Sequence, residues 1–385
     1  MYKAGMCAAT LTRTADGGTE FRYLDAYLAG DGEQIATTLP LDPAPVHSPA
    51  GSVPAFFEGL LPEGHRLTVL RRAVKTSTDD ELSLLLAVGS DAPGDVQIVP
   101  AGEPPADTAA LVEGDSPSEL DFASFVDDVD PHAIPGVQRK ASASMISVPL
   151  SARYGRFILK LSQPDFPHLV ENEAAHLRAA HMLKLAVTRS QLVTDRTGEY
   201  GLLVQRFDRV VDGDAWIRLA FEDATQVLGL PPAAKYQTDA ATVVAALAGI
   251  TDAPLVAIRN LYLQFLFAWL TGNGDLHAKN VGVLWDHGGK WSIAPIYDIP
   301  CTLIYGDDSM ALPIAGRTRR LRAHDWVGFA AEIGLPDRAA ASAREMALRA
   351  AASVDFRGLP FIGSPLHRTE KELRLRRAAL EGSAV

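Results

Sequence analysis

Four polar side chains capable of chemistry stand close together in the stretch TGNGDLHAKN, residues 271–280. Asp275, His277, Lys279 and Asn280 fall within six positions, directly after the apolar run LYLQFLFAWL. A surface turn needs only one or two polar residues, commonly an Asp or Asn that caps the turn. This density of polar groups after an apolar segment predicts a reaction centre rather than an ordinary loop.

The spacing of Asp275 and Asn280, Asp-x-x-x-x-Asn, matches that of a phosphoryl-transfer loop. In such loops the Asp orients or deprotonates the attacking hydroxyl, and the Asn holds a magnesium ion. Asp298 follows in IYDIP, and carboxylate and amide oxygens suit that ion. A hairpin predicted over 281–298, turned by DHGG, explains how these residues return to one point. Each residue alone is more often a turn or cap residue, because short motifs match by chance. Together they indicate phosphoryl transfer.

A second candidate group lies on a predicted strand, RFILKLS. Alternation along the strand separates Lys160 from the face that carries Leu159 and Leu161. A lysine there is costly to bury without an anionic partner, although its flexible stem can also carry the charge to water. Glu173 lies in the first turn of the helix predicted over 171–186, from where its carboxylate can reach back to Lys160. That pairing of a strand Lys with a helix Glu positions nucleotide phosphates in kinases.

Three further stretches carry weaker signals. PGVQRK (135–140) precedes a strand, so it is either a turn or a loop whose backbone N–H groups and Lys140 face a phosphate. VQRFDR ends a strand, where Phe207 can lie against an adenine ring; the alternative is a strand end with a surface Arg–Asp pair. GRTRRLR (316–322) is either a solvated basic face or a contact for a phosphate-bearing partner.

The elements that must position these groups change type along the chain. Strand-like segments and hairpins dominate before residue 221, and helices dominate after it, which predicts an α+β fold with two lobes. We divide the chain into a small α/β N-terminal subdomain (1–101), an acidic linker without Lys or Arg (102–130), a strand-rich lobe (131–220) and a mostly helical lobe (221–385).

Composition sets the broad class of the protein. The 385 residues are 47% hydrophobic and 22% charged, with a formal net charge of −11, which is ordinary for a globular domain and argues against a general nucleic-acid coat. Two cysteines, Cys7 and Cys301, are too few for a disulfide framework or a structural zinc site. We see neither a signal peptide nor a run of about 20 apolar residues that would span a membrane. We therefore expect a cytoplasmic protein.

Taken together, the motifs resemble those of the HipA-like toxin kinases of bacterial toxin–antitoxin systems. FFEGLLPEGHRL and LLLAVGSDAPGDVQIVP resemble the N-terminal subdomain of that family, and GVQRK resembles its phosphate loop. FILKLS with LVENE, LLVQRFDR, EDATQVLGLPPAAKY, GDLHAKN and APIYDI then follow in the order of the family. The combination of Asp-x-His-x-Lys-Asn with Arg-Phe-Asp-Arg is specific.

The resemblance implies a two-lobed protein-kinase-like fold that binds ATP and Mg²⁺ and phosphorylates a serine of a protein. Asp275 would be the catalytic base, and Asn280 and Asp298 would hold the metal. Lys160 would contact the phosphates with support from Glu173. The other implied nucleotide-binding residues are Gly136, Gln138 and Lys140 in the phosphate loop, Gln205 and Phe207 at the adenine, and His277 and Tyr297 near the nucleotide.

The resemblance also implies partners. Protein targets in the family include aminoacyl-tRNA synthetases, and the usual partner is a small helix-turn-helix antitoxin through which the kinase reaches operator DNA. Family members often carry a serine before the phosphate loop whose self-phosphorylation silences the enzyme, but the aligned residue here is Ala133. Either that off-switch is absent, or Ser142 or Ser144 replaces it.

Three functions remain open from the sequence. The leading one is a serine/threonine protein kinase that acts as a toxin. The second is a catalytically weak, kinase-like binding protein that acts mainly with an antitoxin as an operator co-repressor. The third is a small-molecule kinase. Lys160, Asp275, Asn280 and Asp298 favour catalysis, because a pure scaffold does not need all four.

Overall fold

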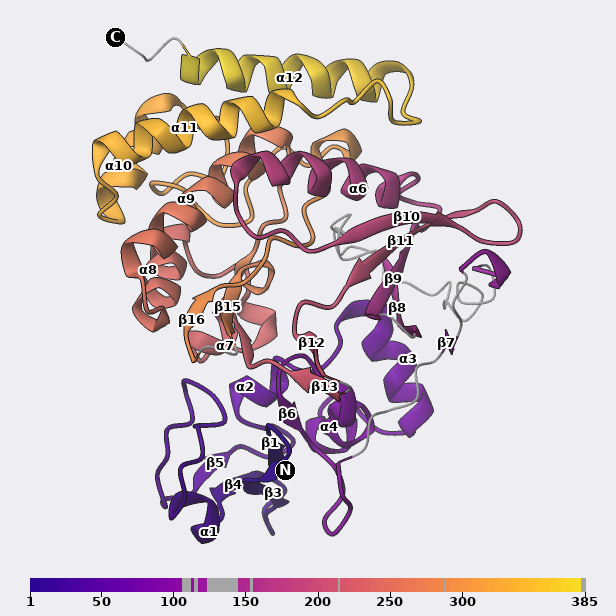
Figure 1. Ribbon diagram of the computed structural model, residues 1–385, viewed down its shortest axis with the longest axis vertical. Coiled ribbons are helices and arrows are strands. Elements are labelled where there is room, and N and C mark those ends of the chain that lie inside the picture. The colour runs from indigo at the N-terminus through magenta and orange to yellow at the C-terminus, as the bar shows by residue number, and fades with distance from the viewer. Residues whose placement is uncertain are drawn as a thin grey trace. The chain divides into compact units, whose positions relative to one another are not determined.

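The computed structural model describes residues 1–105, 112–113, 117–122, 145–152, 155–213, 215–286 and 289–381. Helices and antiparallel sheets alternate along the chain (Figure 1), as expected for an α+β protein. Packing of the backbone groups the chain into two compact units. Unit 1 contains residues 1–109, 208–235 and 282–291, and unit 2 contains residues 110–207, 236–281 and 292–385.

Unit 1 is built from small sheets and short helices. One sheet has the strand order β2-β1-β6 (Met6–Cys7, Tyr2–Lys3, Val96–Gln97), and another has the order β3-β4-β5 (Ala9–Arg13, Thr19–Tyr23, Val46–Ser48). The chain returns to this unit with the hairpin β12-β13 (Arg209–Asp212, Ala215–Arg218), with β14 (Phe221–Asp223) and with β15 (Gly282–Trp285). Its helices are α1 (Asp25–Leu28), α2 (Ala55–Glu58), α3 (Gly64–Val74), α4 (Glu81–Val88) and α7 (Ala224–Val227).

The core of unit 1 is aromatic. Phe21, Phe56 and Phe57 are almost fully buried, and the ring of Phe21 lies edge-on to that of Tyr23 at 5.0 Å between centroids. A buried ion pair between Lys3 and Asp95 joins strand β1 to the turn before β6, with 2.8 Å between Nζ and Oδ1.

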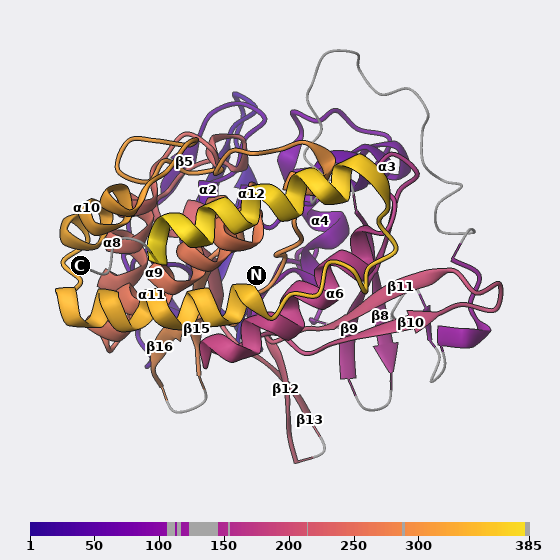
Figure 2. The same ribbon diagram turned by 90° about the horizontal axis from the view of Figure 1, so that it is seen from above.

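A five-stranded sheet forms one half of unit 2, with the strand order β10-β11-β9-β8-β7. Strands β8 (Ile146–Ala152) and β9 (Gly155–Leu161) pair antiparallel, as do β10 (Ser190–Thr194) and β11 (Tyr200–Gln205), and β7 (Val112–Glu113) runs parallel to β8. Helix α6 (Leu169–Ala180) lies along this sheet in both views (Figures 1 and 2). Strand β9 is central, so its residue Lys160 faces Ser147 on one neighbour and Leu202 on the other.

The other half of unit 2 is helical. Helix α9 (Pro254–Thr271) is its centre, because every residue from Leu261 to Thr271 is buried. Helices α8 (Ala240–Ile250), α10 (Ala323–Glu332), α11 (Asp337–Ala352) and α12 (Gly363–Glu381) complete this half. Strand β16 (Trp291–Ile293) follows β15 in the chain. The segment 294–298, which ends with Asp298, comes directly after β16.

Several element boundaries differ from those predicted. The strand predicted at RFILKLS is β9, which begins at Gly155 and ends at Leu161. The helix predicted over 171–186 begins earlier, at Leu169, and ends at Ala180 in a short 3₁₀ turn. Helix α4 starts at Glu81, because Asp80 caps it by accepting a hydrogen bond from the Ser83 N–H. Local propensity predicts the type of an element better than its ends.

Candidate active site

The candidate site is organised around the ammonium group of Lys160. Its Nζ donates to both carboxylate oxygens of Glu173, at 2.8 and 3.0 Å, and to Oδ1 of Asp298 at 3.0 Å. The ion pair predicted between Lys160 and Glu173 is therefore present. Asp298 is 138 positions away in the chain and completes the arrangement.

Burial makes this cluster electrostatically strong. The side chain of Glu173 is fully buried, and those of Lys160 and Asp298 are 13% and 22% exposed. Burial by itself would lower the pKa of Lys160, but the carboxylates of Asp298 and Glu173 outweigh it and raise that pKa above its usual value. Burial raises the pKa of Glu173, while Lys160 and the Asp298 backbone N–H oppose the rise. Lys160 is thus a permanent cation whose charge is not removed at neutral pH.

Helix α6 also anchors the segment that presents Asp298. Asn172, the neighbour of Glu173, is completely buried. Its amide donates to the carbonyl of Cys301 and accepts from the N–H of Cys301, both at 2.9 Å. Asp298 itself has a positive φ of 54°, which is uncommon for a residue other than Gly and costs free energy. The paired hydrogen bonds from Asn172 help to hold the strained segment in place.

Two glycines allow the loop after α9 to fold tightly. Gly272 ends the helix in the left-handed conformation, with φ of 78°. Gly274 donates its N–H to Oγ1 of Thr302 at 2.7 Å. A Cβ atom at Gly274 would stand 2.4 Å from the carbonyl oxygen of Ser309. A side chain at position 274 would therefore force the loop away from its neighbour.

Asn273 links this loop to the segment that carries Asp298. Its Oδ1 accepts from the Asp275 N–H at 2.8 Å, and its Nδ2 lies 3.5 Å from the carbonyl oxygen of Asp298. Asn280 closes the loop from the other end, because its Nδ2 donates to the Asp275 carbonyl at 3.0 Å. The structure thus brings Asp275, Asn280, Asp298 and Lys160 into one hydrogen-bonded neighbourhood.

The carboxylate of Asp275 has a partner that the sequence did not indicate. Asp275 is completely buried, and its Oδ1 accepts a hydrogen bond from the hydroxyl of Tyr236 at 2.8 Å. The ring of Tyr236 also meets His277 edge-on, with 5.1 Å between centroids. Tyr236 follows a Pro-rich turn and has no periodic relation to residue 275, so no local pattern connects the two.

The structure also describes the nucleotide-binding candidates Tyr297, Phe207 and Gln205. The Tyr297 hydroxyl donates to the Lys279 carbonyl at 2.6 Å, and the Tyr297 ring lies 5.5 Å from that of Phe207. Gln205 ends strand β11, where its N–H donates to the Arg189 carbonyl at 2.8 Å. Its side chain is partly exposed.

The Arg–Asp pair of VQRFDR is not a surface pair. Asp208 and Arg209 belong to unit 1 and are both buried. The Arg209 guanidinium donates to Asp208 and to the carbonyls of Ala92 and Gly94, at 2.8 Å in each case. Asp208 also accepts from the Gly94 N–H at 2.9 Å. These two residues fasten the chain to the 91–94 turn within unit 1.

Gly136, Gln138 and Lys140 of the predicted phosphate loop, and Ala133, Ser142 and Ser144 beside it, lie outside the described residues. In the basic stretch 316–322, Arg319 pairs with Asp308 at 3.0 Å and Arg317 lies 3.7 Å from Asp325. The Arg319–Asp308 pair is exposed on both sides, and such pairs stabilise a fold little, whereas Asp325 is buried.

Comparison with known families decides the relationship. The HipA-like C-terminal domain family matches residues 132–354, and the HipA N-terminal domain family matches residues 1–99. The chain belongs to the HipA-like kinase family.

Individual relatives agree with this HipA-like assignment. The putative kinase Y4dM of Sinorhizobium fredii is 30% identical over 353 residues, covering 83% of this chain and 81% of that protein. The serine/threonine-protein kinase toxin HipA of Shewanella oneidensis is 25% identical over 312 residues, covering 74% and 70%.

A solved structure shows the fold of this HipA-like chain. It contains the Shewanella oneidensis MR-1 toxin–antitoxin system HipA and HipB with its operator DNA, and it matches with a TM-score of 0.80 and 21% sequence identity. The match covers 99% of this chain and 97% of the other. The predicted HipA-like α+β fold is therefore confirmed.

Two features are absent from the described residues. No three His, Cys, Asp or Glu side chains converge there on a point that could hold a metal ion. No helix in the same part of the chain is long and apolar enough to cross a bilayer.

Proposed function

We propose that this HipA-like chain is a Mg-ATP-dependent serine/threonine protein kinase that serves as the toxin of a toxin–antitoxin pair in the cytoplasm. The observation that carries the proposal is the arrangement of Lys160 between Glu173 and Asp298, hydrogen-bonded through Asn273 to the loop of Asp275 and Asn280. The ammonium group of Lys160, the carboxylate of Asp298 and the amide of Asn280 lie there close to the buried carboxylate of Asp275. Phosphoryl transfer needs groups of these four kinds.

Each group has a role in the proposed reaction. Asp275 accepts the proton of the attacking serine hydroxyl while the new oxygen–phosphorus bond forms. The bond between the γ-phosphorus and its bridging oxygen breaks, and ADP leaves. Lys160 binds phosphate oxygens, and Glu173 holds the ammonium group in position. Since little covalent chemistry falls to the protein, positioning and charge neutralisation supply most of the rate.

The donor set fits magnesium. Asn280 and Asp298 would hold the ion with one amide and one carboxylate oxygen, and phosphate and water oxygens would complete the shell. Magnesium usually binds one or two carboxylates together with substrate phosphates rather than a cage of protein ligands, so the lack of a three-residue cluster in the described part of the chain is compatible. When bound, the ion neutralises charge that develops on the phosphates.

The remaining roles follow the family pattern. Phe207 and Gln205 would lie at the adenine, Tyr297 and His277 near the nucleotide, and Gly136, Gln138 and Lys140 in the phosphate loop. We propose the same division of the chain as the sequence indicates, with nucleotide contacts from 131–220 and the catalytic loop from 221–385.

The proposed partners rest on the family and on the solved Shewanella assembly, which contains HipB and operator DNA. We propose a small helix-turn-helix antitoxin for this chain, with operator DNA bound through the antitoxin. The proposed substrate is a serine of a translation-related protein such as an aminoacyl-tRNA synthetase.

A growth and labelling experiment tests the function. Wild type and Asp275→Asn are expressed in bacteria, and proteins phosphorylated in a lysate with radiolabelled ATP are identified by mass spectrometry. We expect growth arrest and a labelled protein with wild type only. The exposed Asp252→Asn serves as a matched control and should behave as wild type. Equal toxicity of wild type and Asp275→Asn would instead show a binding protein, and label on a small molecule alone would show a small-molecule kinase.

A further inference from the structure

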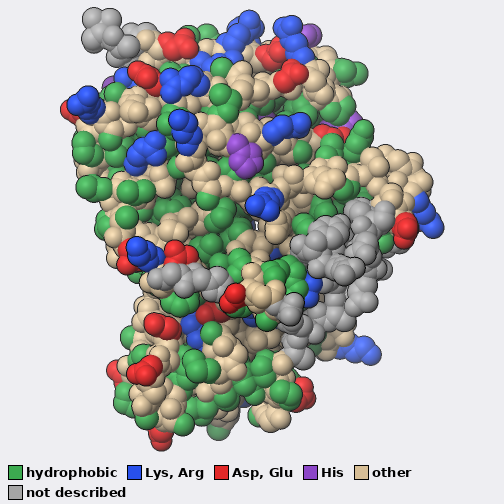
Figure 3. All heavy atoms as spheres, in the orientation of Figure 1, with side chains coloured by type: hydrophobic (Ala, Val, Ile, Leu, Met, Phe, Trp, Pro, Cys, Tyr) green, Lys and Arg blue, Asp and Glu red, His purple; other side chains and the backbone are tan. Residues whose placement is uncertain are grey.

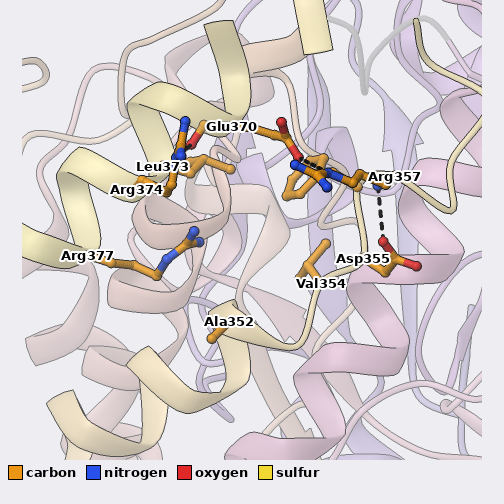
Figure 4. Close-up of a pocket in the computed structure, with 9 residues that line it drawn as sticks. Ala352, Val354, Asp355, Arg357, Glu370, Leu373, Arg374 and Arg377 are labelled. Carbon is orange, nitrogen blue, oxygen red and sulfur yellow. Dashed lines mark hydrogen bonds and ion pairs between the residues drawn. The ribbon is translucent and has the colours of Figure 1, made fainter. Parts of the chain in front are cut away.

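A cavity of about 250 Å³ lies in the helical half of unit 2, among residues that the proposed reaction does not use. The end of α11 and the loop that follows supply one wall, and helix α12 supplies the other (Figure 4). Val354, Phe356 and Leu373 are buried and make part of the lining apolar. Pockets for drug-sized ligands span roughly 300–1,000 Å³, so this cavity admits only a small molecule.

Both acidic side chains of the lining are already engaged. An oxygen of Asp355, Oδ1, accepts from the backbone N–H groups of Arg357 and Gly358, each at 3.1 Å. Glu370 pairs with the guanidinium of Arg357 at 3.1 Å, and Figure 4 shows this pair on the side of the cavity opposite Arg377. Asp355 therefore stabilises the loop after α11, and Glu370 stabilises the contact of that loop with α12.

Two arginines of α12 remain without such a partner. Arg374 and Arg377 both line the cavity, and residues three apart on a helix share a face. Arg374 donates Nε to the Glu370 carbonyl at 3.3 Å. Within the described residues, no carboxylate lies at ion-pair distance from either guanidinium. Burial lowers the pKa of Arg377, and its neighbour Arg374 lowers it further, while Glu381 raises it.

The adjacent Arg376 shows what a structural arginine looks like in this helix. Its guanidinium donates to the Trp269 carbonyl at 2.8 Å and to Glu372 at 3.0 Å, and it stacks over the Trp269 ring. The charge of the Arg376 guanidinium is thus compensated by groups inside the fold. Arg377 is the next residue, and it is half-buried beside the apolar part of the lining. Because a partly buried charge without a partner is costly, an anionic ligand would stabilise it.

Charge around the cavity favours a doubly negative ligand. Helices α11 and α12 carry more Lys and Arg than Asp and Glu, although the whole chain has a net charge of −11. Figure 3 shows Lys and Arg side chains spread over these helices. Two forked guanidiniums three residues apart match the oxygens of a phosphate, which carries up to two negative charges at neutral pH.

We propose that the cavity between the 352–357 segment and helix α12 binds a small organic phosphomonoester. Arg374 and Arg377 bind the phosphate, and Val354, Phe356 and Leu373 contact its apolar group. This site is independent of the proposed kinase centre, since it shares no residue with it.

Calorimetry on the full chain tests this proposal with phenyl phosphate as the probe. We expect saturable binding with one site. Arg377→Gln and Arg374→Gln should each weaken it about tenfold, the effect of losing one charge-assisted hydrogen bond pair. Arg368→Gln removes the same charge from an exposed position of α12 that does not line the cavity, so its affinity should stay within about twofold of wild type. Ala352→Phe, at an exposed position, fills the cavity without changing its charge and should abolish binding.

Two further probes separate the parts of the ligand. Benzoate keeps the ring but carries a single charge, and inorganic phosphate lacks the ring, so both should bind more weakly than phenyl phosphate. The double variant Lys160→Met/Glu173→Gln disables the proposed kinase centre without leaving a stranded buried charge, so where it is folded it should bind phenyl phosphate as wild type does. The proposal is wrong if phenyl phosphate does not bind, if Ala352→Phe or the double variant Arg374→Gln/Arg377→Gln binds as wild type, or if the folded Lys160→Met/Glu173→Gln protein gives no signal.

Discussion

The hydroxyl of Tyr236 donates a hydrogen bond of 2.8 Å to Oδ1 of Asp275, the buried carboxylate proposed to act as the base. The carbonyl of Asp275 is held separately, by the side chain of Asn280 and the N–H of His277. The phenol of Tyr236 thus helps to orient the carboxylate, and hydrogen bonds within the loop hold the backbone of Asp275.

Replacing Tyr236 with Phe tests that orientation. The ring and its contact with His277 are retained while the donor is lost, so the rate of phosphoryl transfer should fall roughly tenfold or more, the usual effect of losing a hydrogen bond to a charged group. Nucleotide affinity, measured by calorimetry, should not change, because the lost donor serves Asp275, the proposed base, rather than the proposed phosphate and metal ligands. Tyr200→Phe, at a half-exposed position, is the control. A loss of affinity with an unchanged rate would contradict the assignment.

Lys160→Met should damage both stability and nucleotide binding. Glu173 would be left buried without its cation, which typically costs about 3–5 kcal/mol, and urea unfolding would measure the loss. The double variant Lys160→Met/Glu173→Gln removes the stranded charge as well, so it should recover much of the stability without recovering ATP binding. The exposed Lys371→Met provides the control. Recovered ATP binding in the double variant would exclude Lys160 as a phosphate ligand.

Gly274→Ala should destabilise the catalytic loop. Its new methyl group would stand 2.4 Å from the Ser309 carbonyl, and overpacking of this kind costs about 1–3 kcal/mol. Gly249→Ala gives a matched comparison, because nothing lies within 4 Å of a Cβ at that helical position. That variant should gain about 0.5–1 kcal/mol from helix propensity. Equal unfolding free energies for the two variants would argue against tight packing at Gly274.

Stability should fall in mild acid partly because of His176. This residue is buried in α6 with Nδ1 against the Asn172 carbonyl, and burial lowers its pKa from 6.5 to about 4. The unfolded chain therefore binds a proton between those two pKa values that the folded chain rejects. Stability contributed by neutral His176 is complete above about pH 6.5 and declines towards pH 4, by on the order of 3 kcal/mol.

His176→Gln should remove that part of the pH dependence. Unfolding free energies measured at several pH values between 4 and 7 should change less steeply for this variant than for wild type. The exposed His181→Gln should keep the wild-type slope. Identical slopes for all three proteins would show that His176 is not the titrating group.

The candidate site was predictable wherever its parts are local. The polar residues after α9, the lysine in a strand and the glutamate in the following helix could all be identified from spacing and hydrophobic pattern. Asn172 also stood beside Glu173, but an Asn in a helix gives no sign that it will clamp the backbone of Cys301. The roles of Tyr236 and of the Asp208–Arg209 pair could not be predicted from the sequence either, because each depends on a contact with a distant segment.

Residue order by itself determined which elements form and which faces carry chemistry, because helix and strand periods and turn chemistry act over a few neighbouring residues. The family resemblance was readable for the same reason, as its motifs are short and contiguous. Only the tertiary structure decided that Tyr236 reaches Asp275, that Asp298 meets Lys160 with a strained backbone, and that no carboxylate of the described residues pairs with Arg374 or Arg377. These contacts join residues on separate elements, and the packing of whole helices and sheets sets them.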